Sequence, residues 1–253
     1  MKRPAALALT LFLLLSCMAC AGAESSSADA PPQTDAVLTG KIVSLGEGTV
    51  LLAGTDGAEL YTLSSGLPVY DDSGVADAGA LRAGQMVGIG FGGDVMESYP
   101  AQLENPAYIR VTAQEDNLVG FYLSILRELW TRDEALNPAG DEVLAFDLSA
   151  LENLTESEKG ALIYLAGCEF GVQGIAGTFD SLSAEGYIDA ENLYFKNGLL
   201  VSFTLSDLTE DSFDFSVSKW RGGLAAYGFN GSACCADRPT GEWNHTLGAE
   251  WIS

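Results

Sequence analysis

The sequence predicts an α+β protein in which a small antiparallel β-barrel precedes a domain of helices followed by an antiparallel sheet. Short apolar segments separated by glycine-rich turns fill residues 37–113. An amphipathic helical stripe opens residues 114–253, and long alternating segments close them. With 47% hydrophobic residues, the chain has enough apolar material for two cores.

The first domain is predicted to contain five short strands. The turns Gly46-Glu47-Gly48 and Thr55-Asp56-Gly57 separate the first three at hairpin distances. The segment 71–83 interrupts the strand pattern and suits a short helix. The expected strands are 37–45, 49–53, 60–63, 86–91 and 107–111. Five strands with an insertion before the fourth are typical of an OB-like barrel.

The second domain is predicted to begin with an amphipathic helix over residues 115–131. Its apolar stripe steps by three and one through Leu118, Phe121, Tyr122, Ile125, Leu126, Leu129 and Trp130. Thr155 and Glu158 form a capping-box pattern, which predicts a second helix closed by Gly171. A strand over 143–148 is expected between these two helices.

The remainder of the second domain is predicted to be an antiparallel sheet. Asn197-Gly198 is a strong hairpin signal and would join the strands 193–195 and 199–205. Three longer strands are expected at 213–220, 224–234 and 243–252. This order of elements is similar to the cone-shaped nuclear-transport-factor-like fold, in which helices close a curved sheet around a pocket.

The first 20 residues read as an export signal. Lys2 and Arg3 precede an apolar stretch at 5–15, which is too short to span a membrane, and small residues follow. Cys17 and Cys20 each fit the bacterial lipobox, in which the cysteine is acylated. The spacer at 21–36 has few large apolar residues and follows Cys20 directly, which favours Cys20, with Cys17 as the alternative.

The charge balance excludes several classes of partner. The chain has 35 acidic and 12 basic residues, and removing Lys2 and Arg3 leaves ten basic residues. Nucleic acids and anionic lipid surfaces need clustered lysine and arginine, so neither is expected as a partner. We expect the protein to be anchored to the outer face of the cell membrane by its N-terminal lipid alone.

The residues that could carry catalysis are few. His245 is the only histidine, and its place on a terminal strand indicates a surface or half-buried histidine. Three cysteines follow the lipobox, and in an exported protein Cys168 and Cys234 are expected to form a disulfide, with Cys235 as the other partner for Cys168. Paired metal-ligand spacing is absent, so no metal site, cofactor or catalytic residue is predicted.

The second domain is predicted to hold a ligand pocket. Its lining is expected from the aromatic and cationic residues Trp130, Tyr194, Trp220, Arg221 and Tyr227. Arg221 is a candidate for an anionic ligand, although a structural salt bridge is the commoner use of such a residue.

Several segments resemble domains of bacterial lipoproteins that have no assigned activity. Residues 37–112 resemble a small barrel domain through Thr39-Gly40-Lys41-Ile42-Val43, Leu81-Arg82-Ala83-Gly84-Gln85 and Glu97-Ser98-Tyr99-Pro100-Ala101-Gln102. Residues 118–253 are similar to a second recurring domain through 154–159, 219–224 and 248–253. The resemblance implies location and architecture, and it carries no activity.

The predicted function is therefore a binding or interaction module of the cell envelope, which contacts an envelope protein or a small molecule without catalysis. The alternative is an extracellular hydrolase that uses carboxylates or a Cys/His pair in the second domain. Convergence of His245 with Cys168 and Cys234 or Cys235 would favour the hydrolase, and their dispersal would favour binding.

Overall fold

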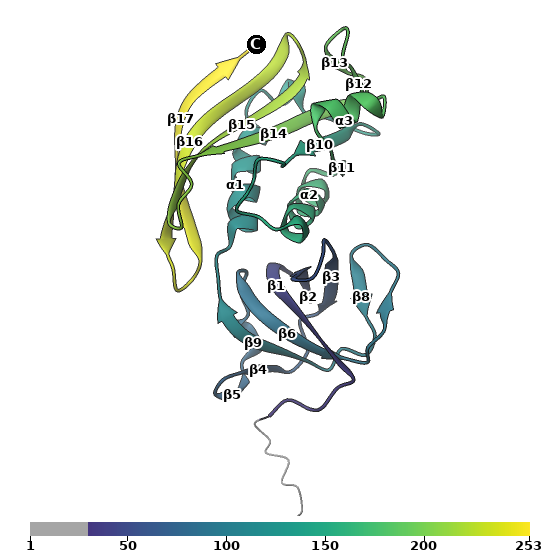
Figure 1. The fold of residues 1–253 in the computed structure, drawn as a ribbon, viewed down its shortest axis with the longest axis vertical. Helices are drawn as coiled ribbons and strands as arrows, with labels where there is room; N and C mark the ends of the chain where they lie inside the picture. The colour runs from purple at the N-terminus through teal and green to yellow at the C-terminus, as the bar shows by residue number, and fades with distance from the viewer. Residues whose placement is uncertain (1–29) are drawn as a thin grey trace, which may run out of the picture.

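The computed structural model describes residues 30–253, which fold mostly into β-sheet (Figure 1). Cys17 and Cys20 lie outside the described residues, so their lipidation stays a prediction. The described part of the chain contains two sheets, of nine and eight strands, and three α-helices. Within residues 30–253, no helix combines the length and apolarity needed to cross a membrane.

The first sheet contains nine strands in the order β5-β4-β9-β6-β1-β2-β3-β8-β7. Their bounds are β1 (Ala36–Gly46), β2 (Thr49–Gly54), β3 (Leu60–Ser64), β4 (Val69–Asp71), β5 (Gly74–Ala76), β6 (Gln85–Phe91), β7 (Val95–Met96), β8 (Ala101–Leu103) and β9 (Tyr108–Gln114). The five predicted strands correspond to β1, β2, β3, β6 and β9. The four strands that the pattern missed have only two or three residues each, too few for a period of two to be recognised.

The first sheet curls around its own apolar core, which includes Ile42, Leu52, Val87, Ile89 and Ile109. Gly90 in β6 is required there, because a Cβ would lie 2.2 Å from the ring of Tyr108. The expected helix at 71–83 is reduced to a single 3₁₀ turn at Ala78–Ala80, and β5 takes up part of the same segment.

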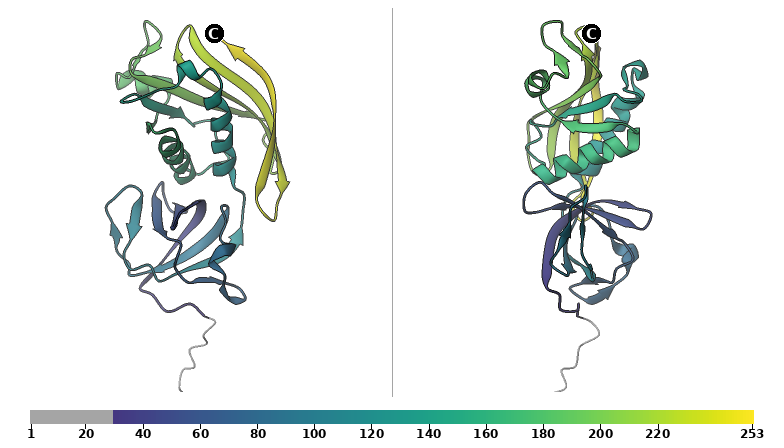
Figure 2. Two further views of the ribbon diagram at one scale, coloured as in Figure 1. Left: turned by 180° about the vertical axis from the view of Figure 1, so that it is seen from behind. Right: turned by 90° about the vertical axis from the view of Figure 1, so that its right-hand side faces the viewer.

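Two α-helices follow from the sequence signals that predicted them. α1 (Leu118–Thr131) begins after Asn117, whose side chain accepts from the Gly120 amide. α2 (Glu156–Phe170) has the predicted capping box between Thr155 and Glu158, and it ends at Gly171 with φ 67°. Figure 2 shows α2 on the side of the second domain that meets the first sheet.

The second sheet is mixed, so the prediction of an antiparallel sheet is only partly right. Its strands are β10 (Val143–Asp147), β11 (Gln173–Ala176), β12 (Ile188–Asp189), β13 (Tyr194–Phe195), β14 (Gly198–Ser206), β15 (Ser212–Gly222), β16 (Ala225–Asp237) and β17 (Glu242–Ile252). β10 pairs in parallel with both β11 and β14, and α2 is the crossover between β10 and β11. β14 to β17 pair as antiparallel neighbours.

The hairpin predicted at Asn197-Gly198 does not form. β14 pairs with β10 and β15, whereas β13 pairs with β12 and β15. Gly198 instead lets β14 approach β10 closely, because a Cβ there would lie 2.5 Å from the carbonyl oxygen of Val143. Long-range parallel pairing of β14 with β10 therefore takes the place of the hairpin that Asn197-Gly198 predicted.

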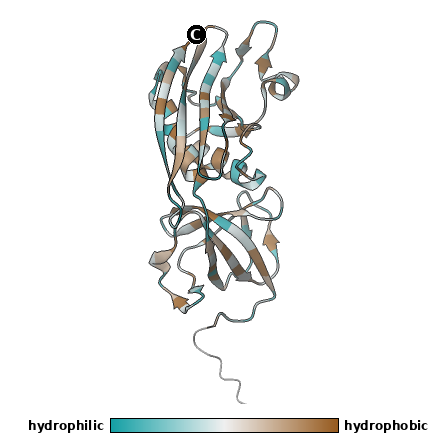
Figure 3. Cartoon of the chain, turned by 60° about the vertical axis from the view of Figure 1, so that its left-hand side comes forward, coloured by the Kyte–Doolittle hydropathy of each residue, from teal (hydrophilic) through white to brown (hydrophobic). Residues whose placement is uncertain are grey.

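The curled part of the second sheet wraps around α1 (Figure 1). Alternation along β15 places Phe213, Phe215 and Val217 in the main core with α1 and α2. Trp220 packs on the other side of the sheet, in a smaller cluster beside α3 (Phe179–Ala184). Figure 3 shows apolar and polar residues alternating along these strands.

Candidate functional site

A buried ion cluster joins the two domains. Lys41 projects from β1, and its Nζ lies 2.7 Å from Glu158 Oε1 on α2 and 3.2 Å from Asp116 Oδ1 in the connecting segment. The side chains of Lys41 and Glu158 are only 13% and 5% exposed. Burial alone would lower the pKa of Lys41, but the Glu158 and Asp116 carboxylates outweigh it and hold that pKa above its ordinary value. The ammonium is therefore charged over the whole physiological range.

Apolar packing and a hydrogen bond continue the contact between the domains. Val43, Leu51 and Leu60 of the first sheet belong to the same core as α1 and α2. Ser157 is completely buried, and its hydroxyl donates to the carbonyl of Gly54 at 2.7 Å. The first turn of α2 is thereby fixed against the end of β2.

A cleft runs along the seam beside this contact, and we call it the interdomain cleft. It consists of three neighbouring hollows of about 480, 820 and 340 Å³. The first and second share Ala58, the second and third share Tyr99, and the first and third share Ile163. Domain boundaries are common places for ligand sites, and this cleft is our candidate functional site.

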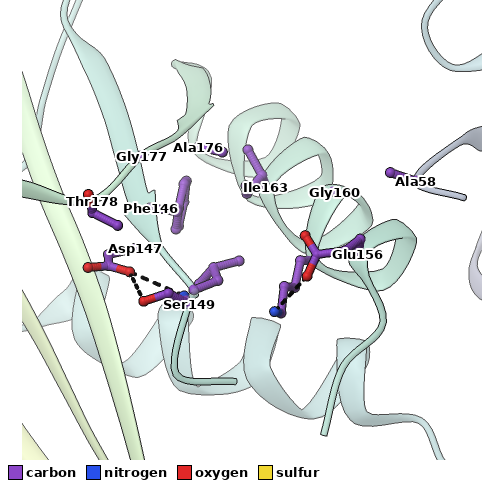
Figure 4. A pocket seen from close by; sticks show the side chains of 12 residues that line it. Ala58, Phe146, Asp147, Ser149, Glu156, Gly160, Ile163, Ala176, Gly177 and Thr178 are labelled. Carbon is purple, nitrogen blue, oxygen red and sulfur yellow. Dashed lines mark hydrogen bonds and ion pairs between the residues drawn. The ribbon is translucent and has the colours of Figure 1, made fainter. Parts of the chain in front are cut away.

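The first hollow lies at the carboxyl ends of β10 and β11, which is where open parallel sheets usually bind ligands. Figure 4 shows Phe146 and Ile163 between two polar groups. On one side Asp147 accepts hydrogen bonds from the amide and hydroxyl of Ser149. On the other, Lys159 Nζ lies 2.8 Å from Glu156 Oε1. The hollow is thus apolar in its centre and charged at its rim.

The second and third hollows add an aromatic and aliphatic wall. The second lies against β7 and β8, where Val95 and Met96 are 44% and 49% exposed. Tyr99 is 67% exposed and meets the ring of Tyr164 edge to face at 5.8 Å between centroids. Gly160 lines the first hollow, and a Cβ there would meet no atom closer than the Tyr99 hydroxyl at 3.8 Å.

The predicted pocket in the second domain is not formed by its five expected residues. Trp130 stacks on Phe170, and Tyr227 is buried in the main core. Trp220 packs on the opposite side of the sheet, against Phe179, and Tyr194 is 43% exposed on β13. Register explains the separation, because Tyr227 pairs with Lys219 and therefore shares its face, whereas Trp220 is the next residue. None of the five lines the interdomain cleft.

Arg221 makes a structural salt bridge. Its guanidinium donates to both carboxylate oxygens of Glu142, at 2.6 and 2.9 Å, and its Nε donates to the carbonyl of Leu136. The bidentate hydrogen bonds from Arg221 lower the pKa of Glu142 to about 2. The anionic partner of Arg221 is thus supplied by the chain itself.

Replacing Glu142 by glutamine is expected to lower the free energy of unfolding at pH 7 by about 1 kcal/mol, because the pair is partly exposed. Since the folded-state pKa is lowered, the stabilisation is complete above the ordinary glutamate pKa and is lost as the pH falls through about 2. Urea unfolding at pH 7 and pH 2 measures this difference. If Glu142→Gln lowers the free energy of unfolding by the same amount at pH 2 as at pH 7, the salt bridge does not lower the pKa of Glu142.

A second buried lysine stabilises the end of α1. Lys219 on β15 is 1% exposed, and its Nζ donates to the carbonyls of Arg132 and Asp133 and to Asn137 Oδ1. Burial lowers the pKa of Lys219 to about 8, against the opposing effect of Asp133 and Glu134. This ammonium holds the loop after α1 against the sheet.

The disulfide predicted between Cys168 and Cys234 is not formed. Cys168, Cys234 and Cys235 are all free. Cys168 lies on α2 at the third hollow, whereas Cys234 lies on β16 and pairs with Ser212 and Asn244. The sequence could not show this separation, because cysteine spacing does not determine connectivity.

His245 is half-buried, as expected, and pairs with Ala233 of β16 beside Cys234, whereas Cys168 lies on α2. Its ring lies 5.9 Å from that of Phe121 and 6.5 Å from that of Phe215, centroid to centroid, on the inner face of β17. Among residues 30–253, no group of three or more His, Cys, Asp or Glu side chains could hold a metal ion.

The cleft residues are not identified by a search of the sequence for reactive side chains, because their residue types are common ones. Residues 97–102 supply Glu97, Tyr99 and Ala101 to the second hollow. Residues 154–159 supply Glu156 and Lys159 to the first. Residues 39–43 contain Lys41 of the ion cluster. Three segments far apart in the sequence therefore meet at the seam.

Comparison with known proteins gives no further assignment: no family model, curated protein or solved structure matches this chain.

Proposed function

We propose that the protein is a lipid-anchored extracytoplasmic binding protein of the cell envelope, and that the interdomain cleft is its ligand site. One observation carries the choice of site: three adjoining hollows lie along a seam that a buried ion cluster and a shared core hold in place. A site held between fixed walls loses little conformational entropy when it binds.

The two domains are further proposed to be an OB-like barrel and a nuclear-transport-factor-like cone. In support of the first, β1 pairs with both β2 and β6 and has an irregularity between Ile42 and Ser44 that bends it. In support of the second, the sheet from β14 to β17 curls around α1 (Figure 1). In neither domain does the fold itself specify a function.

The anchor is testable by metabolic labelling of the full chain with a radioactive fatty acid. We expect the native protein and Cys17→Ser to incorporate label, and Cys20→Ser to lose it. Label retained by Cys20→Ser and lost by Cys17→Ser would move the anchor to Cys17. An unlabelled, unprocessed native chain in the cytosol would overturn the proposed location.

The ligand site is testable by NMR on a fragment of residues 30–253 titrated with a library of small molecules and short peptides. Gly160→Leu is the blocking variant, because Gly160 is helical and its side-chain space is open toward Tyr99. Ser232→Leu on the exposed face of β16 is the control.

We expect bound compounds to shift resonances of cleft residues, and Gly160→Leu to abolish binding while Ser232→Leu retains it. Binding that maps elsewhere, or that survives Gly160→Leu, would overturn the site. Hydrolysis of a chromogenic ester that is lost in Cys168→Ala would support the hydrolase instead.

A further inference from the structure

We infer that the interdomain cleft takes an extended peptide segment that carries both basic and apolar side chains. This inference rests on the proposed function and names the ligand class of the same site. Charge, apolar exposure and shape support it separately.

The charge of the cleft is negative. The first two hollows contain the carboxylates of Glu59, Glu97, Asp147 and Glu156 and a single ammonium, that of Lys159. Lys159 is already paired with Glu156. Within residues 30–253, no basic side chain lies within salt-bridge distance of the other three carboxylates. The cleft therefore attracts cationic groups and repels anionic ones.

The walls of the cleft are apolar where its rim is charged. Large parts of the side chains of Val95, Met96 and Tyr99 are exposed in the hairpin formed by β7 and β8. Exposed apolar residues that gather beside a hollow usually mark a binding surface. Methionine adapts to ligands of different shape, and the exposed ring of Tyr99 can contact either an apolar group or a cation.

The shape of the cleft favours an extended ligand over a compact one. The hollows are separate volumes that meet through Ala58, Tyr99 and Ile163, so neighbouring groups of one ligand would occupy different hollows. A peptide in extended conformation turns successive side chains to opposite sides. It can therefore present a basic group to the rim and an apolar group to the wall.

Fluorescence anisotropy tests the inference with the fragment of residues 30–253 and a short labelled peptide that contains lysine, leucine and phenylalanine separated by serine. Two further peptides replace every lysine by glutamate, or every apolar residue by serine. We expect the first peptide to bind, the glutamate peptide not to bind, and the serine peptide to bind more weakly than the first.

Charge variants separate recognition at the cleft from general attraction to an acidic protein. The double variant Glu97→Gln/Asp147→Asn removes two cleft carboxylates, and Glu47→Gln/Glu191→Gln removes two exposed carboxylates elsewhere. We expect the first pair to weaken binding of the lysine peptide by about fivefold and the second pair by less than about twofold. Met96→Ser should weaken the lysine–leucine–phenylalanine peptide and leave the serine peptide unaffected.

Two outcomes would overturn the inference: equal weakening by the two charge pairs, or binding of the glutamate peptide as tight as that of the lysine peptide. Both are distinguishable from failure of the proposed function. If neutral small molecules bind the cleft and Gly160→Leu blocks them while no basic peptide binds, the site stands and only its ligand class is wrong.

Discussion

Replacing Lys41 by methionine is expected to lower the free energy of unfolding by about 3 kcal/mol, the largest effect of any single substitution proposed for this chain. The substitution leaves the carboxylate of Glu158, which is 5% exposed, without its cation. An uncompensated buried charge costs much more than the net contribution of the intact pair. Urea unfolding of the fragment of residues 30–253 at pH 7 measures the loss.

The double variant Lys41→Met/Glu158→Gln is the control for this prediction. Glutamine keeps the capping contact with Thr155 and has no charge that would be left buried without a cation. We therefore expect the double variant to recover part of the free energy of unfolding that Lys41→Met loses. Because the folded-state pKa of Lys41 is raised, its stabilisation is complete below the ordinary lysine pKa and is lost only as the pH rises through the folded value. A loss below about 0.5 kcal/mol in Lys41→Met would contradict the role of the cluster.

Replacing Lys219 by methionine is expected to lower the free energy of unfolding at pH 7 by about 2 kcal/mol. The substitution leaves three oxygen acceptors without their donor, each of which costs roughly 1 to 3 kcal/mol when buried. Removal of a buried ammonium offsets part of that cost, since burial lowers its pKa to about 8. Thermal or urea unfolding measures the net result.

The pH dependence of the Lys219 effect has the opposite sign to that of Lys41. Between about pH 8 and the ordinary lysine pKa, the unfolded chain binds the proton and the folded chain has released it. The stability of the native protein relative to Lys219→Met should therefore rise with pH across this window. If the difference in free energy of unfolding between the native protein and Lys219→Met stays constant or falls with pH, burial does not lower the pKa of Lys219.

The helices were predictable because their signals are local. The capping box at Thr155 and Glu158 and the glycine at Gly171 each act within a few residues, and α2 begins and ends where they place it. The five longer strands of the first domain followed from alternation and turn residues for the same reason. The sequence of a segment is sufficient to predict its secondary structure where its hydrogen-bond partners lie nearby in the chain.

Pairing over long distances was not predictable in the same way. The parallel contact between β10 and β14 joins residues that are 55 positions apart at Val143 and Gly198, and it displaced the hairpin that Asn197-Gly198 indicated. The same limit applied to the pocket, because Trp220 and Tyr227 are close in sequence but lie on opposite faces of the sheet. Which face of a strand meets a core depends on the register of its neighbours.

The candidate site could not be found from reactive residue types, because its walls come from both domains. Ala58 and Tyr99 belong to the first, and Ile163 and Asp147 to the second. None of these is an unusual residue in its own segment. Only the docking of α2 against β2 and β3 brings them to one place, and that docking depends on Lys41 and Glu158, whose pairing a single sequence does not reveal.

The last strand ends at the pole of the molecule opposite to the start of the described chain (Figure 1). Ser253 exchanges backbone hydrogen bonds with Ala226, so residue 253 is held at the edge of the sheet. A fluorophore or affinity handle added after Ser253 would stand well away from the seam between the domains. Labelling studies of the fragment of residues 30–253 can therefore use this end without obstructing access to the hollows.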